Sequence, residues 1–105
     1  MLKINMEYRK GVLFVRLKGD LTKYTVNSLN NYLIPVITKN GIRYVVYNLG
    51  AVRIIDNYGK ASLEKGVEAT RLNDGETILC NTNLNFNNEF KIVADELSAL
   101  SLLEV

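Results

Sequence analysis

The residues best placed to do chemistry are Asp56, Asn57, Tyr58 and Gly59, where a hydrophobic segment runs into a predicted helix. The first turn of a helix presents unpaired amide hydrogens and about half a positive charge, so side chains that accept hydrogen bonds are stabilising there. We predict that Asn57 caps this helix and that Asp56 fixes the corner by accepting backbone amides. No neighbouring residue offers the partner that general-base catalysis by Asp56 would require. The corner is therefore predicted to bind rather than to catalyse.

Several catalytic chemistries are excluded by composition. The chain has 105 residues, no histidine and a single cysteine, Cys80. The absence of histidine removes Ser/His and Cys/His nucleophilic pairs, imidazole proton transfer and most zinc sites. Cys80 cannot form an internal disulfide and is expected to be a small buried hydrophobe. The glycines never form the close cluster that phosphate loops and dinucleotide sites need. We predict no enzyme activity, cofactor or metal.

The charge balance argues against nucleic acid and membrane partners. Thirteen basic and eleven acidic residues give a net charge of +2, too small for a field that grips a nucleic-acid backbone or an anionic membrane. The apolar stretches are too short to span a bilayer, and the first ten residues alternate in polarity where a secretion signal would be apolar. We expect a cytoplasmic protein with one domain over residues 1–105.

The strands are predicted from alternation and from apolar runs. Residues 2–9 alternate in polarity, and residues 12–17 follow Lys10-Gly11 as a second strand, which predicts an antiparallel hairpin at the sheet edge. Residues 44–49 are almost continuously apolar, as expected for a central strand covered on both faces. Residues 76–80 indicate another strand.

Two helices are predicted between these strands. Apolar spacings of three and four favour a helix from about Thr25 to Gly41, with Thr22 or Thr25 as its cap and a kink at Pro35. Residues 56–72 are long enough for the second helix, although its apolar stripe of Ala61, Leu63, Val67 and Thr70 is thin. The fold class is therefore α/β, with a mixed, mainly parallel sheet, flanking helices and an N-terminal β-hairpin.

The C-terminal quarter begins with an asparagine-rich connection over residues 81–88, which Leu84 and Phe86 are expected to anchor. We predict a short third helix, capped by Asn88 and running through Phe90, Val93 and Ala94. A last edge strand is predicted over residues 100–105.

Two motifs resemble a known family. The segment Val45–Gly59, VVYNLGAVRIIDNYG, and the element Gly19-Asp20-Leu21 before the first helix are similar to those of the STAS family, the anti-sigma factor antagonists of bacteria. The order of elements agrees from Leu2 to about Glu96. Family members usually carry one further helix, which this chain either lacks or replaces with its last segment.

The resemblance implies a regulatory switch without catalysis of its own. Members of the family bind an anti-sigma factor that is a Ser kinase and so release a sigma factor, and phosphorylation of the antagonist ends the binding. The residue at the phosphorylated position is Asn57, which has no hydroxyl group. The next family Ser is Tyr58 here, and Lys60 stands where the family usually has an apolar residue. The neutral Asn57 resembles the unmodified, binding-competent form.

The predicted partner surface combines two segments expected at the same end of the sheet. It consists of Asp20, Leu21, Thr22, Lys23, Tyr24, Asp56, Asn57, Tyr58, Gly59 and Lys60. An alternative interpretation is a degenerate STAS domain that associates with itself or with other STAS proteins as an assembly module in a signalling or transport complex. A small nucleotide-binding or hydrolytic enzyme has only the α/β pattern in its favour.

Overall fold

A central sheet organises the computed structural model, which describes residues 1–86 and 90–103. Within those ranges the strands are β1 (Lys3–Arg9), β2 (Val12–Leu21), β3 (Tyr44–Ile55), β4 (Glu76–Cys80) and β5 (Lys91–Val93). They are hydrogen-bonded in the order β1-β2-β3-β4-β5, and only β1 runs antiparallel to its neighbour. The predicted mixed, mainly parallel sheet is confirmed, with the apolar segment from Tyr44 in its middle strand.

The N-terminal hairpin is also confirmed. Arg9 pairs with Val12, which leaves Lys10 and Gly11 as a two-residue loop. Both loop residues have positive φ, 53° for Lys10 and 81° for Gly11. This backbone is the one that matches the right-handed twist of two joined strands, and glycine adopts it readily.

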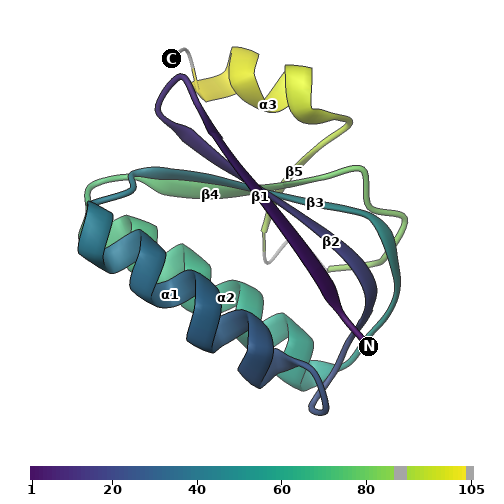
Figure 1. Ribbon diagram of the computed structural model, residues 1–105. Helices are drawn as coiled ribbons and strands as arrows, with labels where there is room; N and C mark the ends of the chain where they lie inside the picture. The colour runs from purple at the N-terminus through teal and green to yellow at the C-terminus, as the bar shows by residue number, and fades with distance from the viewer. Residues whose placement is uncertain (87–89, 104–105) are drawn as a thin grey trace.

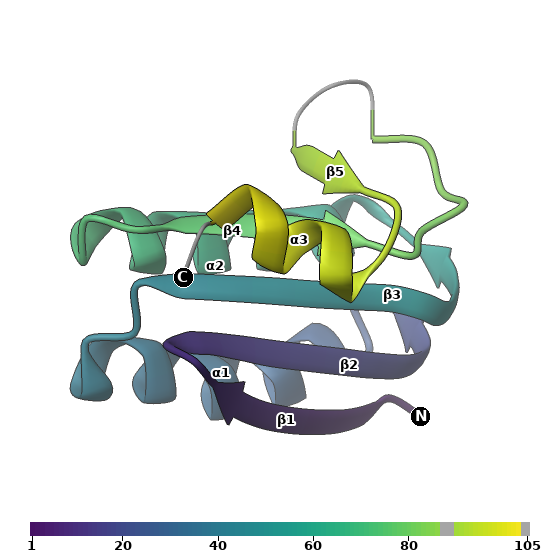
Figure 2. The ribbon, with the colours of Figure 1, turned by 90° about the horizontal axis from the view of Figure 1, so that it is seen from above.

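The helices cover the two faces of the sheet unequally (Figures 1 and 2). Helices α1 (Val26–Asn40) and α2 (Asn57–Leu72) lie side by side on one face, and α3 (Glu96–Leu103) lies on the other. The larger core is under α1 and α2, where Leu29, Leu33 and Ile37 are fully or almost fully buried. No helix of the described ranges has the length and apolar character needed to cross a membrane.

Helix α1 continues through Pro35 to Asn40, and its ribbon shows no sharp bend there (Figure 1). The proline therefore does not interrupt the helix, and Leu33 and Ile37, on either side of it, are both buried. Gly41 ends the helix in the left-handed conformation, as expected. Thr25 occupies the N-cap position, but its side chain makes no capping hydrogen bond.

Both predictions for the last segment are wrong. Residues 91–93 form strand β5 instead of a helix, and residues 96–103 form helix α3 instead of an edge strand. Asn88, the predicted cap, and residues 104–105 lie outside the described residues. Strand β5 exists through pairing with β4, which a local pattern does not reveal. Leu84 and Phe86 do pack against the core, as predicted.

Helix α2 approaches the sheet through small residues rather than through the predicted apolar stripe. Leu63 and Thr70 are buried, but Ala61 is exposed, and the remaining buried positions include Gly59, Gly66 and Ala69. A Cβ atom added at Gly66 would overlap the hydroxyl group of Tyr47, a fully buried residue of the middle strand. That hydroxyl has no hydrogen-bond partner in the described structure.

Gly66→Ala is therefore expected to lower the free energy of unfolding by about 1–3 kcal/mol, although glycine to alanine usually stabilises a helix. Tyr47→Phe should raise it by about 1 kcal/mol, because it removes an unpartnered buried hydroxyl. The double variant should recover most of the loss. Urea unfolding of the four proteins tests this coupling, and strictly additive effects would contradict it.

Candidate functional site

The carboxylate of Asp56 joins the two segments predicted to form the partner surface. Its Oδ1 accepts a hydrogen bond from the amide of Gly59 at 2.8 Å, and its Oδ2 accepts one from the amide of Lys23 at 3.0 Å. The backbone amide of Asp56 donates to the carbonyl of Leu21 at 3.3 Å. Residues 20–24 and 56–60 are therefore held together at one end of the sheet.

Asp56, and not Asn57, is the N-cap of α2. Asp56 has extended backbone angles, φ −107° and ψ −173°, whereas Asn57 is the first helical residue. The prediction that Asp56 accepts backbone amides is confirmed, and the prediction that Asn57 caps the helix is wrong. The side chain of Asn57 is exposed and makes no hydrogen bond within the described part of the chain. It is therefore accessible from solvent.

Gly59 allows the close contact between α2 and β2. A Cβ atom at this position would overlap the carbonyl oxygen of Leu21, which is itself completely buried. Leu21 is paired with Ile55 at the end of the β2–β3 ladder, directly before Asp56. Both Gly59 and Leu21 are buried, and they support the surface from beneath.

The loop before α1 is fixed by its own hydrogen bonds. Thr25 Oγ1 donates to the carbonyl of Asp20 at 2.8 Å and accepts from the amide of Thr22 at 2.9 Å. Thr22 Oγ1 in turn accepts from the amide of Tyr24 at 3.3 Å. One carboxylate oxygen of Asp20, Oδ1, is buried without a hydrogen-bond partner in the described residues. These hydrogen bonds fix the backbone of the loop that carries the exposed side chains of Lys23 and Tyr24.

The exposed side chains of the two segments are those of Lys23, Tyr24, Asn57 and Tyr58. Together with Ile54, which is exposed near the end of β3, we call them the corner surface. Tyr24 is 85% exposed, Tyr58 is 61% exposed and Ile54 is 54% exposed. The ammonium group of Lys23 lies 5.1 Å from the centroid of the Tyr24 ring. Sequence reasoning missed Ile54, because an isoleucine at a strand end gives no local signal of exposure. The half-buried Lys60 faces the Phe86 ring at 6.0 Å and lies outside this surface.

The electrostatics of the corner follow from the backbone amides around Asp56. Burial raises the pKa of this carboxyl group, but the hydrogen bonds from the amides of Gly59 and Lys23 outweigh that effect and hold the pKa below its ordinary value. Asp56 is therefore ionised at neutral pH. It serves as a structural anion at the helix N-terminus.

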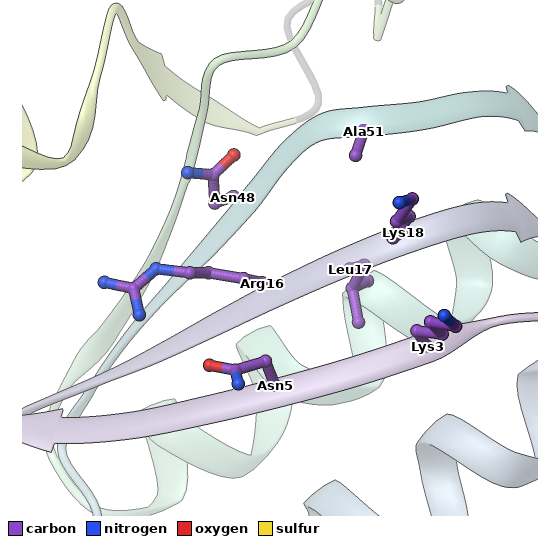
Figure 3. Close-up of a pocket in the computed structure, with 7 residues that line it drawn as sticks. All are labelled: Lys3, Asn5, Arg16, Leu17, Lys18, Asn48 and Ala51. Atoms are coloured by element: carbon purple, nitrogen blue, oxygen red, sulfur yellow. The ribbon is translucent and has the colours of Figure 1, made fainter.

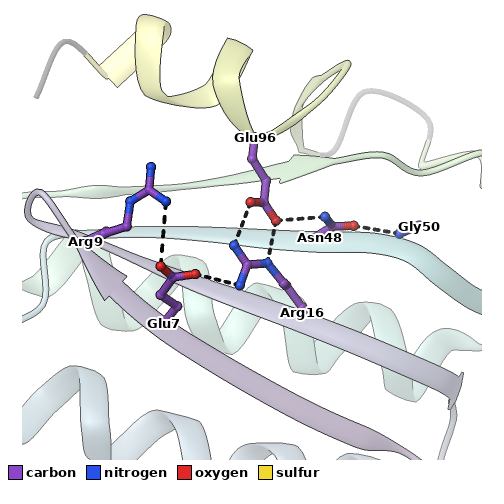
Figure 4. Close-up of polar contacts among 6 residues, drawn as sticks. All are labelled: Glu7, Arg9, Arg16, Asn48, Gly50 and Glu96. Carbon is purple, nitrogen blue, oxygen red and sulfur yellow. Dashed lines mark hydrogen bonds and ion pairs between the residues drawn. The ribbon is translucent and has the colours of Figure 1, made fainter.

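A second polar cluster lies on the α3 face of the sheet (Figure 4). Arg16 donates to both carboxylate oxygens of Glu96, through Nε and Nη2, each at 2.8 Å. Its Nη1 donates to Glu7, also at 2.8 Å, and Asn48 donates to Glu96 at the same distance. The hydrogen bond from Arg16 lowers the pKa of Glu96, and the two carboxylates raise the pKa of Arg16.

This cluster attaches α3 to strands β1, β2 and β3, and sequence reasoning missed it. The available signal was an arginine inside the apolar run Val12–Leu17. A charged side chain in a largely buried strand requires partners. Its partners are distant in the chain, since Glu96 is eighty residues away from Arg16.

The described residues offer little for catalysis. They contain no group of three potential metal-ligating side chains. Cys80 is buried, and burial raises the pKa of its thiol to about 12, so the thiolate is disfavoured. Ser62 is also buried and donates to Asn30 Oδ1 at 2.5 Å.

Comparison with known proteins gives a consistent result. A family model described as the STAS domain matches residues 3–94. The anti-sigma F factor antagonist of Paenibacillus polymyxa is 28% identical over 113 residues, covering 99% of this chain and 97% of that protein.

Solved structures show the same fold. The unphosphorylated form of the anti-sigma factor antagonist SpoIIAA superimposes with a TM-score of 0.80 at 18% identity, covering 97% of this chain and 98% of that one. An anti-sigma factor antagonist from Mycobacterium paratuberculosis gives a TM-score of 0.84 at 17% identity, with 100% and 96% covered. The family that the two sequence motifs resemble is confirmed by the match of the STAS domain model to residues 3–94.

Removal of the Asp56 carboxylate tests its bridging role. Asp56→Ala should lower the thermal midpoint by about 5 °C, whereas Asp56→Asn should lose less, because its amide oxygen still accepts the Gly59 hydrogen bond. The pKa of Asp56 is depressed in the folded protein. The higher thermal midpoint of wild type relative to Asp56→Asn should therefore be fully present above pH 3.8, the ordinary pKa, and should disappear as the pH falls through the folded-state pKa. Thermal unfolding between pH 2 and pH 7 measures this, and a constant difference would contradict it.

Proposed function

We propose, since the chain belongs to the STAS domain family, that it binds an anti-sigma factor of the Ser kinase type through the corner surface. We further propose that Asn57 keeps this antagonist in its binding-competent form whether or not ATP is present. The observation that carries the proposal is the exposed, neutral and unpartnered side chain of Asn57 at the first residue of α2. The resemblance to the family implies that this residue occupies the position at which family members are phosphorylated.

The chemistry of residue 57 supports constitutive binding. A phosphoserine would add about two negative charges and considerable bulk to this surface. An asparagine side chain has no hydroxyl group and remains uncharged, so it cannot accept the phosphoryl group in that reaction. Structures of SpoIIAA exist in both the unphosphorylated and the phosphorylated form, so that relative is modified. The present chain is proposed to lack this control at residue 57.

The neighbouring hydroxyl groups are poor substitutes as phosphoryl acceptors. Ser62 is one turn into α2, but it is 2% exposed and engaged with Asn30. Thr22 is half-buried and its Oγ1 accepts the amide of Tyr24. Tyr58 is exposed, but a phenol is a different acceptor from the aliphatic alcohol that a Ser kinase modifies. These contacts support a surface without regulation by a Ser kinase.

Affinity at the corner surface is expected to come from its aromatic side chains. Tyr24 and Tyr58 are more than half exposed, and tyrosine buries a large area with few rotatable bonds. The backbone beneath each is already fixed, by the Thr22 and Thr25 hydrogen bonds in one segment and by the Asp56 cap in the other. A partner therefore meets a preorganised surface, which lowers the entropy cost of binding.

Substitutions at residue 57 test the switch directly. Asn57→Asp should weaken binding to the purified cognate anti-sigma kinase by about tenfold or more, because it places a charge in the interface. Asn57→Ser should bind like wild type without ATP, should be phosphorylated when ATP is added, and should then dissociate. Surface plasmon resonance with and without ATP, together with mass spectrometry of the antagonist, measures both effects.

Asn31→Asp is the matched control, because it adds the same charge on an exposed position of α1 outside both corner segments. It should bind like wild type. If wild type itself is phosphorylated at Tyr58 or Ser62 and released by ATP, constitutive binding is wrong. If light scattering instead shows a stable homo-oligomer that no substitution at residue 57 alters, and no kinase binds, the assembly alternative is favoured.

The aromatic contribution has its own test. Tyr24→Ala and Tyr58→Ala should each reduce affinity for the kinase by about tenfold, with an unchanged thermal midpoint. Tyr32→Ala is the control, since Tyr32 is 57% exposed on α1 and lies outside the corner surface. Equal affinities for all three variants in calorimetric titrations would exclude the corner surface as the binding site.

A further inference from the structure

The α3 face of the sheet is only partly covered. Helix α3 packs on an apolar patch that includes Val12, Phe14, Val46 and Ile78. Beyond this patch the same face carries polar side chains around a surface pocket of about 370 Å³ (Figure 3). The residues that line it are Lys3, Asn5, Arg16, Leu17, Lys18, Asn48 and Ala51. No carboxylate is among them.

The pocket contains two lysines directly opposite each other on neighbouring strands. Lys3 of β1 is paired with Lys18 of β2 in the antiparallel ladder, so both side chains leave the sheet on the same face. Figure 3 shows both stems rising from that face. Like charges in directly opposed positions are destabilising. Neither ammonium group forms an ion pair or hydrogen bond within the described ranges.

The neighbouring arginine does not need a further anion. The guanidinium group of Arg16 is bound by Glu7 and by both carboxylate oxygens of Glu96. Those contacts engage the carboxylates of Glu7 and Glu96, and no carboxylate of the described residues forms an ion pair with Lys3 or Lys18. The excess positive charge of the pocket therefore belongs to Lys3 and Lys18.

Asn5 adds a neutral hydrogen-bond donor to the pair. It is two residues along β1 from Lys3, on the same face of the sheet, and is paired across the ladder with Arg16. Its side chain forms no hydrogen bond within the described structure. The pocket thus combines two cations with a free amide, and none of these residues belongs to the corner surface.

We propose that this pocket binds a phosphate group, either free phosphate or a phosphate monoester. Such a group carries about two negative charges and three or more acceptor oxygens in a tetrahedral arrangement. Two ammonium groups neutralise it fully, and oxygens that point in different directions can accept from both lysines and from Asn5. A single carboxylate would leave one of the opposed lysines uncompensated. Binding relieves the repulsion between the strands and so stabilises the hairpin.

The experiment uses the intact chain and titrates sodium phosphate or glycerol 3-phosphate against sodium chloride at matched ionic strength. Phosphate should raise the thermal midpoint of wild type at millimolar concentration and shift the backbone amide resonances of residues 3, 5 and 18. Lys3→Gln and Lys18→Gln should each weaken phosphate binding about tenfold. The double variant should lose it, and should be at least as stable as wild type in chloride because the repulsion is gone.

Lys39→Gln/Lys65→Gln is the matched control, because it removes two exposed lysines from α1 and α2 on the other face of the sheet. It should retain phosphate binding. Equal affinity for both ligands identifies the free-phosphate site, and tighter binding of glycerol 3-phosphate identifies a monoester site. If phosphate stabilises wild type and Lys3→Gln/Lys18→Gln equally, or if the shifted resonances lie elsewhere, the proposal is wrong.

Discussion

Two hydrogen bonds accepted by the Asp56 carboxylate position both segments of the proposed partner surface. One caps α2 at Gly59, and the other holds the loop before α1 at Lys23. Because β2 and β3 are parallel and end together at Leu21 and Ile55, their outgoing segments begin side by side. A single ionised side chain then joins segments more than thirty residues apart. The surface that carries Asn57 is consequently a property of the fold and not of one loop.

The two faces of the sheet have different chemical character for a physical reason. Helices α1 and α2 cover one face with a continuous apolar core, whereas α3 is short and covers only part of the other. The uncovered part must be polar, and its charges must find partners or remain in solvent. Arg16 finds Glu7 and Glu96, which fixes α3 to the sheet. Lys3 and Lys18 have no ion-pair partner in the described chain and are exposed to solvent, where they form the proposed phosphate site.

Local sequence signals predicted the elements wherever one face of a segment was buried over several turns or several strand residues. The hairpin, β3, α1 and α2 all satisfy this condition. The C-terminal segment does not: β5 has three residues and exists through its ladder with β4, while α3 has Leu97 and Leu102 exposed and Ala99 buried. Periodicity carries no information in such segments. The capping error had a similar origin, because Asp56 and Asn57 are equally good caps by type and only the backbone angles distinguish them.

The sequence was enough to predict the α/β class, the central position of the strand beginning at Tyr44, the family motifs and the lack of a hydroxyl group at residue 57. These are consequences of residue type and short-range spacing. Three features are visible only in the folded chain: Asp56 holds both corner segments, Ile54 is exposed as Tyr24 and Tyr58 are, and Lys3 is paired with Lys18. Each of these features depends on strand register and packing. Both bring together residues that are far apart in the sequence, so no local pattern predicts them.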